Sequence, residues 1–328
     1  MSGAAQPSPA VDDSAVALFE AERARLVGLA YRMLGSRSDA EDVVQDGWLR
    51  WQGQSASRAV IERPQAWLTT VVSRLALDRL RARQRDRADY VGPWLPEPVI
   101  LADDPSAVVE RRDSLRLGFV HLLERLNPRE RVAFVLSDVF DEPHQSISTV
   151  LDESVVNCRQ LVSRARRKLA APAATAAGST TAVAAAAASM VPSLGAVAMR
   201  RSELAAGTDV LDAFLAAAGG GDLAALLDVL APDVVLVSDG GPDRHAARRP
   251  LVGSERVARF VLSIARRVRA DATYDVVAVN GERALLVRSC DRPVLALWVD
   301  GGEAGIGVIR VVVNPMKLAA LGTAVAMA

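Results

Sequence analysis

The side chains best suited to chemistry lie in one basic stretch in the middle of the chain, residues 143–168. Asn157 and Gln160 carry amides, which can pair bidentately with an adenine in the DNA major groove. The arginines beside and after them can hold backbone phosphates. The pattern therefore favours recognition of nucleic acid, and the candidate residues are Asn157, Arg159, Gln160, Ser163, Arg164 and Arg167.

Two helices and a tight turn must position these side chains. Apolar residues within 147–151 give a first short helix one apolar edge, the pair 152–153 makes the break, and Ser154 is a good N-cap for the second helix. From Cys158 to Leu169 the apolar residues recur at helical spacing and would face a core. This is the layout of a helix-turn-helix, whose second helix enters the major groove. A helical hairpin with a solvated basic face stays open as the alternative.

Composition limits the other classes of function. The chain has 328 residues, which predicts two or three compact units, and its formal net charge is zero, so bulk charge does not indicate a partner. Cys158 and Cys290 are far apart and the three histidines are scattered, which argues for a reducing cytosol without a disulfide, metal site or cofactor. We see no signal peptide and no convincing membrane span, so we expect a cytoplasmic protein with no membrane partner.

Charge is segregated locally instead. An acidic group at residues 39–46 contains no basic residue, and a run of arginines follows at residues 74–87, diluted by aspartates. Such blocks are usually solvated faces, but two basic blocks beside helix signals favour a partner that carries phosphates.

Helical and strand-like spacing then divides the chain into units. Pro64 suits the start of a helix, and the four prolines within residues 90–105 exclude one there. Helices are expected over 15–34, from Ser36 or Ser38, from Pro64, and over 107–126, 128–140, 203–218, 222–230 and 254–268, with strands over 233–237, 273–279, 283–288, 294–299 and 307–313. The expected units are a helical unit at 14–89, a proline-rich docked linker at 90–106, a helical unit with the helix-turn-helix at 107–169, an alanine-rich linker at 170–200 and an α+β unit with antiparallel strands at 201–320.

Several segments resemble a known family. SDAEDVVQDGWLRW (38–51) resembles the core-polymerase-binding helix of bacterial sigma factors, RPQAWLTTVVSRLALDRLRAR (63–83) resembles their −10 promoter helix, and residues 126–169 are similar to the −35-reading domain. The absence of other sigma regions indicates the extracytoplasmic-function type. WLPEP (94–98), SDGG (238–241) and NPMKL (314–318) resemble the subgroup with a C-terminal SnoaL-like domain. The resemblance implies a multidomain fold, with two all-α sigma domains followed by an α+β NTF2-like cone.

The resemblance also implies partners and residue roles. The partners would be the β and β′ subunits of RNA polymerase core, and promoter DNA. Asp39, Glu41, Asp42 and Gln45 would face the polymerase clamp helices, although an ordinary acidic first turn of a helix is an alternative. The loop at 52–63 could hold a flipped base, and Trp67 lies so near the packing stripe that a core role competes with stacking. The implied −10 residues are Trp67, Thr70, Arg74, Arg79 and Arg81.

The C-terminal unit is expected to regulate the sigma domains in cis, and a small-molecule ligand for it is left open. Asp239 and His245 are a nearby acid–base pair, but nothing shows the dry pocket that catalysis needs, so we do not expect an enzyme. Two alternatives are a ligand-responsive helix-turn-helix regulator and a SnoaL-type enzyme fused to a DNA-binding module. The implied regulatory contacts, which could also be a simple turn and helix start, are Trp94, Pro96, Asp239, Gly240, Asn314, Pro315 and Lys317.

Overall fold

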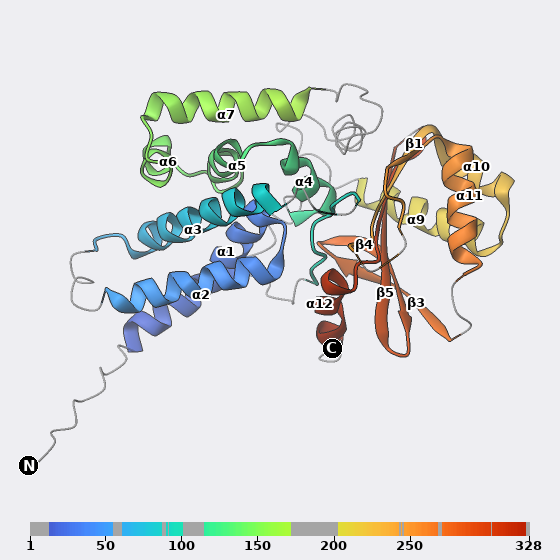
Figure 1. Cartoon of the computed structure of the whole chain (residues 1–328), viewed down its shortest axis with the longest axis horizontal. Coiled ribbons are helices and arrows are strands. Elements are labelled where there is room, and N and C mark those ends of the chain that lie inside the picture. The colour runs from blue at the N-terminus through green and yellow to red at the C-terminus, as the bar shows by residue number, and fades with distance from the viewer. Residues whose placement is uncertain are drawn as a thin grey trace, which may run out of the picture.

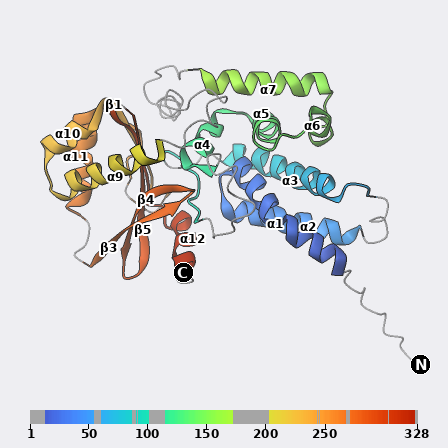
Figure 2. The same ribbon diagram turned by 180° about the vertical axis from the view of Figure 1, so that it is seen from behind.

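The computed structural model describes residues 13–54, 61–86, 90, 92–100, 115–171, 203–242, 244, 246–267, 271–302 and 304–325. Among the described residues, the helices α1 to α7 form one body, and a sheet with its own helices forms a second body beside it (Figure 1). The view from behind shows that the two bodies meet near α4 of the first body and α12 of the second (Figure 2). Two all-α domains followed by an α+β domain are thereby confirmed. Residues 55–60 of the loop at 52–63, and residues 172–200 of the linker at 170–200, lie outside the described residues.

The first helical domain consists of α1 (Asp13–Leu34), α2 (Arg37–Gly53) and α3 (Pro64–Asp86). Gly35 adopts a φ of 66°, which ends α1, and the Ser36 side chain then caps α2 by accepting from the Asp39 amide. Apolar residues at helical spacing line the interior, where Trp51 is fully buried. Trp67 is half-buried with its ring centroid 5.4 Å from that of Trp51, which places it against the core.

The second helical domain holds α4 (Leu117–Leu122), a 3₁₀ turn, α5 (Pro128–Phe134) with a π-helical continuation, α6 (His144–Leu151) and α7 (Val155–Ala170). The helix expected over 107–126 is not continuous, because Arg116 has non-helical backbone and α4 begins at Leu117. The expected start at 107 lies outside the described residues, as do residues 107–114. Asp152 turns the chain with a φ of 53°, and Ser154 caps α7 by accepting from the Asn157 amide. Cys158 is buried in a hydrophobic core that the two helical domains share.

The C-terminal domain contains a six-stranded sheet of order β2-β1-β6-β5-β4-β3. The four later strands pair antiparallel as expected, whereas β1 pairs with β6 in parallel, a pairing that was not predicted. The two-residue strand β2 was not expected from the sequence. The elements are α9 (Glu203–Gly219), α10 (Leu223–Val229), β1 (Leu230–Asp239), β2 (Leu251–Val252), α11 (Ser254–Ala265), β3 (Ala272–Val279), β4 (Glu282–Ser289), β5 (Arg292–Gly302), β6 (Gly305–Val312) and α12 (Pro315–Val325).

The two faces of this sheet are covered differently. Alternate side chains such as Leu236 and Leu297 face α9, α10 and α11, while their neighbours Val237 and Trp298 face the helical body. That second face is completed by α12 and by two residues from outside the C-terminal domain, Leu95 and Leu117. The linker and the start of α4 are therefore part of the C-terminal domain's hydrophobic core.

Candidate functional site

The exposed side of α7 carries a shallow groove of about 430 Å³. Its lining contains five of the six nucleic-acid candidates, together with Val156, which is exposed without an apolar partner surface. In the described part of the chain, no carboxylate forms an ion pair with the arginines that line it. The lining residues are Val156, Arg159, Gln160, Ser163, Arg164 and Arg167.

The two amide candidates differ in their surroundings. The Asn157 side chain donates to the Glu153 carboxylate over 3.0 Å, so its amide is already engaged. Gln160 lies in the groove, where its backbone carbonyl accepts from the Arg164 guanidinium and its side-chain amide makes no hydrogen bond with the described residues. Arg166, which is not part of the lining, pairs with Asp138 over 2.8 Å. Gln160 is therefore the amide that this surface presents to a ligand.

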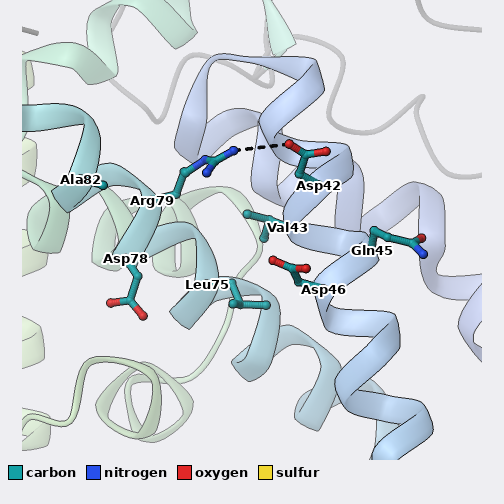
Figure 3. Close-up of a pocket in the computed structure, with 8 residues that line it drawn as sticks. All are labelled: Asp42, Val43, Gln45, Asp46, Leu75, Asp78, Arg79 and Ala82. Atoms are coloured by element: carbon teal, nitrogen blue, oxygen red, sulfur yellow. Dashed lines mark hydrogen bonds and ion pairs between the residues drawn. The ribbon is translucent and has the colours of Figure 1, made fainter. Parts of the chain in front are cut away.

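A second groove, of about 490 Å³, separates α2 from α3 (Figure 3). Asp42 lies on one side and Arg79 on the other, and their side chains meet across it over 3.3 Å. Arg79 also pairs with Asp39 over 2.9 Å, and Arg83 pairs with Asp39 as well. The groove is lined by Asp42, Val43, Gln45, Asp46, Leu75, Asp78, Arg79 and Ala82.

Charge in this groove is mostly negative. Three of its lining side chains are aspartates and one is an arginine, which gives a surface suited to a basic partner. The structure brings Asp39, Asp42 and Gln45 to this edge, whereas Glu41 pairs with Arg37 one turn earlier. Asp46 was left out of the sequence candidates although it follows Asp42 by four residues, one helical turn on the same face.

The candidates on α3 are engaged inside the molecule. The Arg74 guanidinium donates to the Thr149 carbonyl over 2.6 Å and to the Val150 carbonyl over 3.4 Å, at the C-terminal end of α6. A cation is favoured there because the last carbonyls of a helix carry partial negative charge. Arg81 forms an exposed pair with Asp78, and the Thr70 hydroxyl donates to the Ala66 carbonyl of its own helix.

Asp239 is the centre of the contact between the C-terminal domain and the linker. Its fully buried carboxylate accepts from the Tyr90 hydroxyl over 2.6 Å, from the Leu95 amide over 2.8 Å and from the Gly241 amide over 3.1 Å. Lys317 completes the set with an ion pair of 2.6 Å. A carboxylate with four donors is not placed to abstract a proton, and His245 lies outside the described residues.

The remaining linker candidates lie around this carboxylate. The Lys317 ammonium is 4.1 Å from the centre of the Trp94 ring and also donates to the Leu95 carbonyl. Asn314 donates to the Tyr90 hydroxyl over 3.1 Å, and its side chain accepts from Met316 at the start of α12. The other three regulatory candidates shape the backbone and make no side-chain hydrogen bond to Asp239. Pro96 is buried, Pro315 begins α12, and a Cβ on Gly240 would lie 2.7 Å from the Arg244 carbonyl.

Sequence reasoning missed a second set of contacts at the other end of the linker. Asn280 is fully buried and bonds to the linker and to both helical domains. The Glu97 carboxylate, inside the linker, accepts from the Arg37 amide over 2.8 Å at the start of α2. The sequence gives little indication of the role of Asn280, because an Asn-Gly pair between two strands is also typical of an ordinary hairpin turn.

Comparison with known proteins shows which family the chain resembles. Residues 18–86 match the model of sigma-70 region 2, and residues 116–169 match that of sigma-70 region 4. The ECF RNA polymerase sigma factor SigJ of Mycobacterium tuberculosis is 38% identical over 272 residues, which cover 81% of this chain and 79% of that protein. The probable ECF sigma factor SigI of the same species is 34% identical over 314 residues, covering 93% and 95% of the two chains.

A solved structure extends the similarity to the C-terminal domain. The crystal structure of M. tuberculosis SigJ superposes with a TM-score of 0.68 at 32% sequence identity, and the match covers 93% of this chain and 98% of that one. None of the described helices is long and apolar enough to cross a membrane. The two family models, the relatives that match most of the chain and the shared three-part fold together show that the chain belongs to the extracytoplasmic-function sigma factors of RNA polymerase.

Proposed function

We propose that this sigma factor binds RNA polymerase core through the groove between α2 and α3, and that its C-terminal domain holds the free protein in a closed form. The first part rests on the aspartates that line the groove. Acidic side chains on a rigid helix pair can dock a basic helix pair, and they set register and association rate more than affinity. When core polymerase arrives, Arg79 would leave its internal carboxylate partners, which frees Asp39 and Asp42 for the basic helix pair and Arg79 for the −10 strand.

Promoter contacts follow from the exposed faces of α7 and α3. Gln160 is our base-reading residue on α7, with Asn157 able to join it once released from Glu153. Arg159, Arg164 and Arg167 would hold phosphates of the −35 element. On α3, Arg74, Arg79 and Arg81 would track the −10 strand, while Trp67 would keep its place in the core.

The observation that carries the closed form is the bond between the two promoter-binding domains. The −10 and −35 elements are about 25 base pairs apart, which is about 85 Å along a duplex that rises 3.4 Å per pair. Here Arg74 of the −10 helix lies 2.6 Å from the Thr149 carbonyl of the helix-turn-helix. Because one protein in this form cannot reach both elements at once, the two domains must separate before transcription starts.

The C-terminal domain opposes that separation by holding the linker. Its Asp239 and Lys317 fix Tyr90, Trp94 and Leu95. Trp94 in turn packs against Gly35, where an added Cβ would lie 2.7 Å from the indole ring. A linker held at Tyr90, Trp94 and Leu95 cannot extend there, so the domain would act as a brake that core polymerase must overcome.

Run-off transcription tests the proposed function. The full chain is mixed with core polymerase and a template library in which the −35 and −10 elements are randomised. We expect discrete start sites that require the protein and a selected −35 sequence. Binding of duplex DNA that needs no core polymerase, with no transcripts, would instead favour a helix-turn-helix regulator.

The phosphate-holding arginines give a prediction about salt. Replacing both Arg164→Ala and Arg167→Ala should weaken holoenzyme binding to every promoter sequence alike, because phosphates carry no sequence information. The slope of log affinity against log salt should become shallower by about 2, since about one counterion is released per phosphate contact. Gln160→Ala is the matched control: it should leave the slope unchanged and relax the −35 preference. A −35 preference that survives Gln160→Ala would contradict the base-reading role.

A further inference from the structure

The turn between β3 and β4 places one polar side chain where three segments of the chain meet. Asn280 has a φ of 56° and is fully buried, although it occupies a hairpin turn, where residues are normally exposed. Left-handed backbone is accessible to Asn, Asp and Gly at low cost, so the turn alone would accept any of these residues. The identity of the side chain must therefore be explained by its contacts.

Those contacts use every hydrogen-bonding group of the amide. The Oδ1 atom accepts from the Val99 amide over 3.1 Å, and the backbone N–H of Asn280 donates to the Val99 carbonyl over 2.7 Å. The Nδ2 group donates to the Tyr31 hydroxyl over 2.7 Å and to the Leu115 carbonyl over 3.0 Å. The Tyr31 hydroxyl donates to the Glu97 backbone carbonyl over 2.7 Å. One side chain thereby joins the linker, α1 and the segment that leads into α4.

Glu282, two residues later, strengthens the hold on α4. Its carboxylate accepts from the Leu117 amide over 3.1 Å and pairs with Arg116 over 2.5 Å. Burial raises the pKa of Glu282 and the Arg116 guanidinium opposes that rise, as expected for a carboxylate enclosed by its partner. Gly118 then lies against the buried Arg310 guanidinium, which a Cβ would approach to 3.0 Å. Asn280 in the β3–β4 turn and Glu282 after it therefore bind residues 115–117, at the start of the −35 domain.

We propose that Asn280 is the positioning residue that keeps the closed form together, by joining the linker, the −10 domain and the −35 domain in one buried hydrogen-bond set, here called the Asn280 junction. This inference rests on the closed form proposed above. A buried amide that loses one partner bears the desolvation cost of an unmade bond. Release of any one of the three segments therefore destabilises the contacts to the other two, and the junction opens as a unit.

The experiment uses the full-length chain with Asn280→Asp, Asn280→Gly and Tyr31→Phe. Aspartate keeps the turn and the acceptor for the Val99 amide but has no N–H for Tyr31 or Leu115. Tyr31→Phe removes one hydroxyl and nothing else, which guards against a failure of the first variant to fold. Tyr274→Phe is the matched control, because Tyr274 is an exposed tyrosine on β3.

Amide hydrogen exchange reads the junction directly. The acceptors of the Val99 and Leu117 amides, Asn280 Oδ1 and Glu282 Oε2, survive in Asn280→Asp. Faster exchange of both amides in that variant therefore reports opening of the whole junction. We expect a rise of at least roughly tenfold at both amides with Asn280→Asp and Tyr31→Phe, because each variant loses two buried hydrogen bonds, and no rise with Tyr274→Phe.

Affinity for core polymerase supplies a readout that a purely structural role would not move. If only the open form binds, the apparent dissociation constant falls as the open fraction rises, again by roughly tenfold. Unchanged or weaker core binding by both Asn280→Asp and Tyr31→Phe overturns the inference, as does faster exchange of Val99 without Leu117. If the wild-type chain does not bind core polymerase, the proposed function is wrong. If the wild-type chain binds and the variants bind with the same affinity, only the role of the Asn280 junction is refuted.

Discussion

Replacing Asp239 by alanine should free the linker, and it is the largest effect on stability that we expect from one substitution. Lys317, whose side chain is 12% exposed, would keep its place beside Trp94 without a carboxylate partner. Removing one partner of a buried ion pair costs about 3–5 kcal/mol, because the remaining charge is uncompensated. The Leu95 amide, which donates to Asp239, should lose exchange protection by a factor of more than about 100.

The control for this substitution is Asp228→Ala, which removes an exposed carboxylate from the same domain. It should leave the exchange of Leu95 unchanged. Run-off transcription at limiting core polymerase should rise with Asp239→Ala if the linker contact is a brake. Loss of Leu95 protection accompanied by a fall in transcription would show that the contact assists initiation, and our proposal of a closed, inhibited form would be wrong.

The second large effect is expected from Asp42→Arg in the groove between α2 and α3. The substitution places a cation where we propose that a basic helix pair docks, and opposed like charges cost several kcal/mol. Binding to core polymerase, measured by anisotropy of a labelled chain, should weaken by roughly 100-fold. Folding should change little, because the Asp42–Arg79 pair is solvent-exposed and such pairs contribute little.

A charge-matched substitution separates this effect from a change in net charge. Asp233→Arg alters an exposed carboxylate of the C-terminal domain by the same two units. It should lower the association rate slightly and leave the dissociation rate unchanged. If Asp233→Arg weakened core binding as much as Asp42→Arg, the groove would not be the docking surface.

The helix-turn-helix could be predicted because its determinants are local. The N-cap Ser154, the break at Asp152 and the apolar spacing of α7 all act within one or two helical turns. The sigma regions and the three-part fold were likewise predictable from short motifs in a fixed order. The same local rules indicated the acidic edge of α2, and the four-residue spacing of Asp42 and Asp46 on one helix face could also have identified Asp46.

Contacts between distant segments could not be predicted. Tyr31 and Asn280 are 249 residues apart, and Arg74 and Thr149 are 75 apart, so no periodicity relates them. The parallel pairing of β1 with β6 was missed for the same reason, because alternation identifies a strand but not its neighbour. Arginines on α3 looked free for DNA in the sequence, whereas their partners are carboxylates and carbonyls supplied by other helices.

Leu95 and Leu117 belong to the interior of a domain that begins about a hundred residues after them. In an isolated C-terminal domain, the apolar sheet face around Val237, Ala296 and Trp298 would therefore be exposed to water. Exposed apolar surfaces of this kind lead to self-association, so the excised domain should aggregate. A gene rearrangement that separated the sigma domains from the C-terminal domain would leave a C-terminal domain that aggregates. This cost favours keeping both in one reading frame.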